Sequence, residues 1–227
     1  MSPPSRPPAS DPTTAKRAYD SSRRQEQARR TRRRVVEAAS ALFVEQGYAA
    51  TSVAEVAVAA EVSPQTIYGA FGTKAALLGA AVEIAMVGDD EPVAVLDRPE
   101  AQEALAAADP ESAAAGFARM ATRLLERAGR LLHAADAAAQ EDPDLRALWE
   151  NGHRARLADM RRTADAFAAS GLLRPGLDAE AAADLLWALA SPDTFRSFTV
   201  LRGWSARRYQ RWVRDTLLAT VLRPADR

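Results

Sequence analysis

The side chains with the clearest chemical potential lie between residues 51 and 74, and they are amides, hydroxyls and an amine rather than catalytic groups. Gln65 can make a bidentate hydrogen-bonded contact with adenine, and Pro64 and Thr66 can pack apolar atoms against thymine methyl groups. Lys74 can neutralise a phosphate. Plain exposure to solvent is the alternative for Gln65. Together these side chains predict nucleic-acid binding.

An arginine-rich segment lies N-terminal to these residues. Residues 23–34 contain seven arginines, including Arg32 and Arg33, and residues 1–34 carry ten Lys/Arg against three Asp/Glu, although the whole chain has no net charge. A basic segment on a neutral chain indicates a polyanionic partner that binds locally. A solvated, disordered tail is the alternative explanation of the same composition.

Other chemistries find little support in the sequence. There is no cysteine, and His133 and His153 are the two histidines, which cannot complete a zinc site alone. Neither a P-loop nor a G-x-S-x-G nucleophile motif is present. We therefore expect no enzymatic activity, no metal and no other cofactor. No apolar run approaches the roughly 20 residues that span a bilayer, and no signal segment is evident, so we expect a cytoplasmic protein without a membrane partner.

Two short predicted helices must position the candidate DNA contacts. Ser52 and Glu55 fit a capping box, which predicts the start of the first helix. Ser63 followed by Pro64 predicts the start of the second, because serine caps a helix and proline suits its first position. Two such helices joined by a tight turn form a helix-turn-helix, whose second helix can enter the DNA major groove.

This region resembles the DNA-binding domain of the TetR family of transcriptional repressors (the TetR/AcrR type). The resemblance rests on Gly47-Tyr48-Ala49-Ala50-Thr51-Ser52-Val53, Val62-Ser63, Thr66-Ile67-Tyr68, Phe71, Lys74 and Leu77-Leu78. It implies that Tyr68 contacts the phosphate backbone, with packing between helices as the alternative. Two positions depart from the family: the usual turn glycine is Glu61, and Gly69 replaces a larger residue that could contact DNA.

The predicted base and phosphate contacts are therefore Thr51, Ser52, Ser63, Pro64, Gln65, Thr66, Tyr68, Gly69, Lys74, Arg32 and Arg33. Thr51 has a second interpretation as a capping residue. No choice between the two follows from the sequence.

The helical periodicity predicts an all-α protein of about nine helices. We expect a disordered tail over residues 1–26, a three-helix DNA-binding domain with a connecting fourth helix over 27–87, and a helical domain over 88–227. Within the last, a short helix is expected at 100–107. Helix stops are expected at Asn151-Gly152 and Ser170-Gly171, and one helix, kinked at Pro192, from Asp178 to about 202.

The resemblance also implies a homodimer and a small-molecule pocket in the C-terminal domain. The candidate dimer residues are Leu185, Leu189, Phe198, Trp212 and Leu217. The candidate pocket residues are Phe117, Met120, Leu124, His133, Trp149, His153 and Phe167. Packing in the protein core is the alternative for each of these side chains.

The expected function is thus sequence-specific regulation of transcription. A homodimer would bind double-stranded DNA at a palindromic operator, and an unknown small-molecule inducer would release it. Two alternatives stay open: a nonspecific architectural DNA binder that uses the basic arm, and a helical small-molecule-binding protein with a degenerate DNA-binding domain.

Overall fold

The computed structural model describes residues 12–89, 91 and 93–224, with side chains from residue 23 onward. This part of the chain contains ten α-helices and no β-strand, so the all-α prediction is confirmed. The elements are α1 (Pro12–Glu45), α2 (Val53–Ala59), α3 (Pro64–Phe71), α4 (Lys74–Val87), 3-10 helix η1 (Val95–Asp97), α5 (Pro99–Leu105), α6 (Pro110–Ala139), α7 (Pro143–Ala169), α8 (Ala179–Leu189), α9 (Pro192–Arg196), π-helix η2 (Ser197–Leu201) and α10 (Ala206–Thr220).

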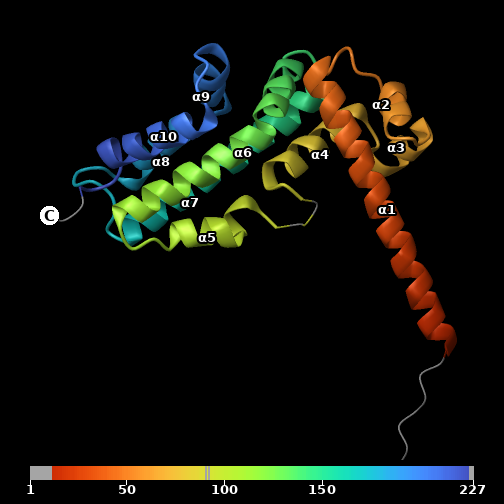
Figure 1. Ribbon diagram of the computed structural model, residues 1–227, viewed down its shortest axis with the longest axis horizontal. Helices are drawn as coiled ribbons and strands as arrows, with labels where there is room; N and C mark the ends of the chain where they lie inside the picture. Colours follow the sequence, from red (N-terminus) through yellow and green to blue (C-terminus); the bar gives the residue numbers. More distant parts are fainter. Residues whose placement is uncertain (1–11, 90, 92, 225–227) are drawn as a thin grey trace, which may run out of the picture.

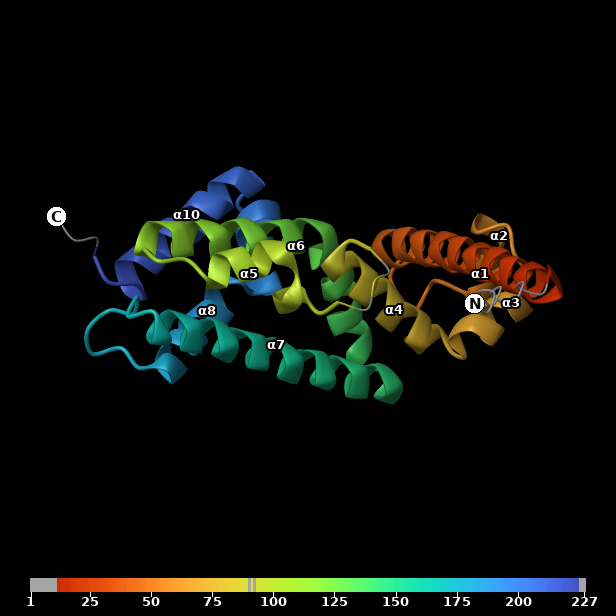
Figure 2. The ribbon, with the colours of Figure 1, turned by 90° about the horizontal axis from the view of Figure 1, so that it is seen from below.

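The molecule is elongated, with α1 to α4 at one end and α5 to α10 at the other (Figures 1 and 2). The N-terminal core holds buried side chains of the first four helices, including Phe43, Ile67 and Leu78. It also includes Leu131 from α6 and Leu145 from α7. Helices of the C-terminal part therefore cover one side of the N-terminal core. Helix α4 packs against helices of both parts of the molecule, α1 and α6.

Helix α1 begins earlier than the sequence analysis predicted. The expected tail over 1–26 lies partly outside the described residues, but residues 12–26 are helical and project beyond α2 and α3 (Figure 1). Pro12 occupies the first helical position, and neither proline nor glycine follows until Gly47. Good helix formers and the i,i+4 ion pair between Glu26 and Arg30, at 3.0 Å, favour helix without tertiary contacts.

Helix α7 continues through the predicted stop at Asn151-Gly152, so that prediction is wrong. A glycine inside a helix costs about 1 kcal/mol, whereas α7 buries Leu145 before this point and Met160 and Phe167 after it. Tertiary packing therefore outweighs local propensity. The helix does end at Ala169, just before the predicted stop at Ser170-Gly171.

The long helix predicted to begin at Asp178 is broken into α8, α9 and η2. The Ser191 hydroxyl accepts a hydrogen bond from the Asp193 backbone N–H and Pro192 takes the first helical position, so α9 starts anew. Because of this break, the described residues form ten α-helices where about nine were predicted. The predicted short helix at 100–107 is confirmed as α5.

The C-terminal core lies between α6, α7, α8 and α10. Its largest buried side chains include Phe117, Phe167, Leu186, Tyr209 and Leu217. The Tyr209 hydroxyl donates a hydrogen bond to the Leu189 carbonyl at the end of α8. That bond satisfies the buried hydroxyl and fixes α10 relative to α8.

Candidate DNA-binding surface

Helix α2 starts at the predicted capping box. The Ser52 hydroxyl accepts from the Glu55 backbone N–H at 3.1 Å, and the Glu55 carboxylate accepts from the Ser52 backbone N–H at 2.7 Å. Val53, Val56 and Ala57 then bury one face of the helix in the N-terminal core. The cap fixes where α2 begins, and the buried face fixes how the helix lies in the core before the turn into α3.

Helix α3 exposes the residues predicted to read DNA. The Ser63 hydroxyl accepts from the Thr66 backbone N–H at 3.1 Å, as expected of a capping residue. Ile67 is 1% exposed and anchors the helix in the core, whereas Tyr68 is 50% exposed. The other exposed residues of the helix face are Pro64, Gln65, Thr66 and Gly69. Side chains suited to base edges and phosphates are thus brought together on one accessible helix.

The turn between α2 and α3 has an unusual backbone. Glu61 has φ +54°, and among the described residues it is the sole residue other than glycine with positive φ. The Val62 N–H donates to the Ala57 carbonyl at 3.0 Å, as in a Schellman motif. Glutamate therefore takes the left-handed position that glycine usually fills, and its carboxylate lies 3.9 Å from Arg34.

Lys74 has a different role from the one predicted. Its ammonium donates to the backbone carbonyls of Tyr48, at 2.9 Å, and Thr51, at 3.0 Å, and it lies 4.1 Å from the centre of the Tyr48 ring. Two of its three N–H groups are thereby engaged within the protein. Lys74 fastens the loop before α2 to the start of α4, and the predicted free phosphate contact is corrected accordingly.

The structure decides between the two interpretations of Thr51, as a capping residue or as a DNA contact. Thr51 is 1% exposed, and its hydroxyl donates to the Gly47 carbonyl at 2.8 Å. A buried hydroxyl whose proton is already donated cannot reach a phosphate. The local, structural role is therefore correct, and the DNA contact is withdrawn for this residue.

The predicted arginine contacts lie on the exposed side of α1. Arg32 stacks on the Phe71 ring, 4.4 Å from its centre, and donates to the Ala70 carbonyl at 3.4 Å. Arg33 pairs with Glu37 at 2.8 Å. Arg32 thus stands at the C-terminal end of α3, beside the exposed face of that helix.

A hydrogen bond that the sequence analysis missed joins the two ends of the molecule. The Tyr48 hydroxyl, in the loop before α2, donates to the Asp142 carboxylate, which caps α7, at 2.9 Å. This bond is the largest influence that lowers the pKa of Asp142. Burial, followed by the Asp142 hydrogen bond, raises the pKa of Tyr48. Nothing in the sequence pairs two residues so distant in the chain.

The predicted ligand-pocket residues do not form one pocket. Phe117 and Phe167 are each 1% exposed in the C-terminal core, and His133 is exposed on α6. Trp149 packs against the N-terminal core, and His153 lies between Trp149 and Trp187, with ring centroids 4.8 and 5.6 Å apart. These five predictions are corrected to core or surface roles, because α6 and α7 turn the side chains toward different neighbours.

Met120 and Leu124, the remaining two, do line a cavity. It has a volume of about 310 Å³ and lies between the end of α4, the start of α5 and the middle of α6. Its lining residues are Met86, Val87, Val95, Arg98, Pro99, Glu100, Ala101, Met120, Arg123, Leu124 and Arg127. Its size falls near the lower end of the range for small-molecule sites, about 300–1,000 Å³.

The candidate dimer residues divide into two groups. Leu189 is 7% exposed and Leu217 is fully buried, so both belong to the core of the single chain and are corrected. Leu185, Phe198 and Trp212 are partly exposed. Phe198 and Trp212 belong to an aromatic cluster, with ring centroids 4.6 Å apart. Leu185 and these two rings remain available to a partner.

Two features are absent from the part of the chain that the structure describes: a cluster of metal ligands and a single membrane-spanning helix. No group of His, Asp or Glu there could hold a metal ion. No single helix there is long and apolar enough to cross a membrane, while α3 and α4 satisfy length and composition together as a pair bent by 71°.

The fold of this chain has counterparts in known proteins. Residues 35–81 match the family model described as bacterial regulatory proteins, tetR family. A proposed TetR-family transcriptional regulator from Mesorhizobium loti is 26% identical, with a TM-score of 0.62 over 86% of this chain and 98% of that one. No match was found among curated proteins.

Two repressors of multidrug efflux pumps share the fold. NalD, the secondary repressor of the MexAB-OprM pump in Pseudomonas aeruginosa, is 22% identical with a TM-score of 0.64, over 87% of this chain and 98% of that one. SmeT, the repressor of the SmeDEF pump of Stenotrophomonas maltophilia, was solved with triclosan. It is 22% identical with a TM-score of 0.63, over 85% of this chain and 91% of that one.

Proposed function

We propose that this chain, whose residues 35–81 match the tetR-family model, is a transcriptional regulator of that family and represses transcription from a palindromic operator. It binds there as a homodimer, in the cytoplasm where bacterial DNA lies. A small molecule that binds the C-terminal part releases it. Release requires the ligand to bind the state unable to hold DNA more tightly than the state that holds it.

One observation carries the proposal: the first turns of α3 are exposed but firmly held. Ser63 caps the helix and Ile67 anchors it, so Gln65 and Thr66 stand on a rigid support. Gln65 suits adenine, and Thr66 suits a thymine methyl group. Because one such helix reads only a few base pairs, a two-fold dimer with half-sites about one DNA turn apart suits the geometry.

The efflux-pump repressors support the remaining parts of the proposal. NalD and SmeT are repressors with this fold, and SmeT binds triclosan. In this chain the exposed Val200 and Leu201, at 63% and 66%, mark an apolar surface beside the aromatic cluster of Phe198 and Trp212. That surface suits a second copy of the chain.

Selection of bound sequences from a random duplex pool tests this function. The full chain should enrich a palindrome, and one dimer should bind each duplex, as measured by the mass of the complex in solution. Enrichment of no motif, or binding that vanishes at moderate salt and yields to any competitor DNA, would instead indicate nonspecific attachment through the arginine-rich segment.

A further inference from the structure

The cavity at the end of α4 combines an apolar lining with an excess of positive charge. Met86 and Val87 from α4 and Met120 and Leu124 from α6 supply apolar surface. Arginines from two elements reach the same cavity, against Glu100 as its one acidic lining residue. The lining arginines are Arg98, Arg123 and Arg127. Such a wall suits a small molecule that is mostly apolar and carries a negative charge.

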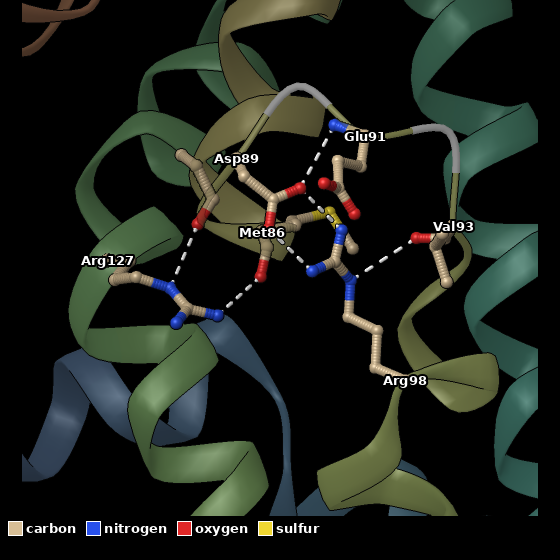
Figure 3. A network of polar contacts seen from close by, with 7 residues as sticks. Met86, Asp89, Glu91, Val93, Arg98 and Arg127 are labelled. Atoms are coloured by element: carbon tan, nitrogen blue, oxygen red, sulfur yellow. Dashed lines mark hydrogen bonds and ion pairs between the residues drawn. The ribbon is translucent and has the colours of Figure 1, made fainter.

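Two of the three guanidinium groups are already neutralised. Arg98 makes two parallel hydrogen bonds of 2.7 Å to the Asp89 carboxylate, and they lower the pKa of Asp89 to about 2 (Figure 3). Arg123 pairs with Glu100 at 2.8 Å. Within the described part of the chain, Arg127 makes no ion pair. Its charge helps to lower the pKa of Asp89, but it is the arginine of this cavity that no carboxylate of the described residues pairs with at hydrogen-bond distance.

Arg127 instead binds the C-terminal end of α4. It donates to the carbonyls of Met86, at 2.7 Å, and Ala85, at 3.3 Å, as Figure 3 shows for the Met86 contact. The last carbonyls of a helix lack partners within the helix and form the negative end of its dipole, so a cation there is stabilising. Arg127 thus caps α4 from the neighbouring helix.

We propose that this cavity binds a small carboxylate with an apolar body, and that Arg127 is its anion-binding residue. The inference rests on the proposed function and names the chemical class of the releasing ligand. A carboxylate offers a guanidinium two parallel charge-assisted hydrogen bonds together with an opposite charge, which the neutral carbonyls of α4 lack. The ligand therefore draws Arg127 away from α4 while its apolar part fills the space between Met120 and Leu124.

This exchange reaches the DNA-binding surface through α4. When Arg127 turns to the ligand, the last turn of α4 keeps its C-cap at Gly88 but loses the two hydrogen bonds from Arg127, while the first turn still holds the loop before α2 through Lys74. The ligand binds this state better, since only there is the guanidinium of Arg127 released from the carbonyls of α4. A difference of this kind is what a shift between two states requires.

Titration of the full chain with three probes of equal chain length tests the ligand class. We expect calorimetry to detect octanoate binding, and 1-octanol and octylammonium to bind at least about tenfold more weakly. Equal binding of octanoate and octanol would overturn the proposal, as would preference for the ammonium. This comparison uses the unaltered protein, so it does not depend on whether a variant folds.

Two variants on α6 locate the site. Arg127→Gln should weaken octanoate binding at least about tenfold, whereas Arg130→Gln, on the same helix but not lining the cavity, should leave it unchanged. Equal affinities in both variants would refute the role of Arg127. Octanoate should also release the selected operator. If octanoate binds as described but the selection yields no operator, the proposed function is contradicted. If an operator is confirmed but octanoate does not bind, only this inference is contradicted.

Discussion

Glu61 shows how a single residue departs from what its backbone favours. A residue with a Cβ atom in the left-handed conformation is destabilised by about 1–2 kcal/mol relative to right-handed helix, and Glu61 has φ +54°. Its weak contact with Arg34, at 3.9 Å between exposed side chains, offsets little of that. The strain is confined to the turn that sets the direction of α3 relative to α2.

Glu61→Gly should therefore raise the free energy of unfolding by about 0.5–1 kcal/mol, since the relief of strain exceeds the entropy that glycine loses on folding. Urea denaturation measures the difference. Glu83→Gly, at an exposed position inside α4, is the control and should lower stability by about 1 kcal/mol. Equal losses in both variants would show that the turn at Glu61 is not strained.

The hydrogen bond from Tyr48 to Asp142 should make stability depend on pH. Because the pKa of Asp142 is lowered in the folded protein, its contribution is fully present above the ordinary aspartate value of 3.8 and is lost as pH falls below it. Tyr48→Phe should thus destabilise the protein at pH 7 but by less near pH 3. Denaturation at the two pH values measures this, and a constant difference would contradict it.

The sequence predicted the helix caps well because their determinants are local. Ser52 and Ser63 each cap the helix expected of them. The sequence could not predict the binding partner of Lys74, because an ammonium group at the start of a helix can bind a phosphate or a nearby carbonyl equally well. The carbonyls it binds belong to a loop over twenty residues earlier, and only folding brings them close.

At the scale of elements, local signals predicted where helices start better than where they stop. Asn151-Gly152 resembles a stop, yet α7 continues because Met160 and Phe167 are buried beyond it. The predicted pocket failed for a related reason. Periodicity places Phe117 and His133 on α6, but it does not say that one faces the core and the other the solvent.

The N-terminal half of α1 should act in DNA binding through charge. Deletion of residues 1–30 removes six arginines, leaves Arg32 and Arg33, and should weaken operator binding with a flatter dependence on salt. Each lost phosphate contact reduces the slope of log K against log salt by about 0.9. Anisotropy titrations across a salt series measure the slope, and an unchanged slope would assign no phosphate contact to this segment.

The whole molecule is proposed to act as a dimer through its exposed C-terminal surface. Leu201→Asp should weaken self-association, because a charge would be buried against the second copy, while the helical content stays unchanged. Val58→Asp, at a residue 81% exposed on α2, is the control and should leave self-association intact. Sedimentation over a range of concentrations distinguishes the two, and equal behaviour would place the dimer surface elsewhere.

The central claim is that the exposed face of α3 reads bases, and a double-mutant cycle tests it most directly. Operator variants with each A·T pair replaced would be titrated against the unaltered chain, Gln65→Ala and, as a control, the exposed Gln46→Ala. We predict that Gln65→Ala couples with one A·T position in each half-site by about 1–3 kcal/mol and that Gln46→Ala couples with none. Specific binding with no coupling between Gln65 and any base pair would contradict the account.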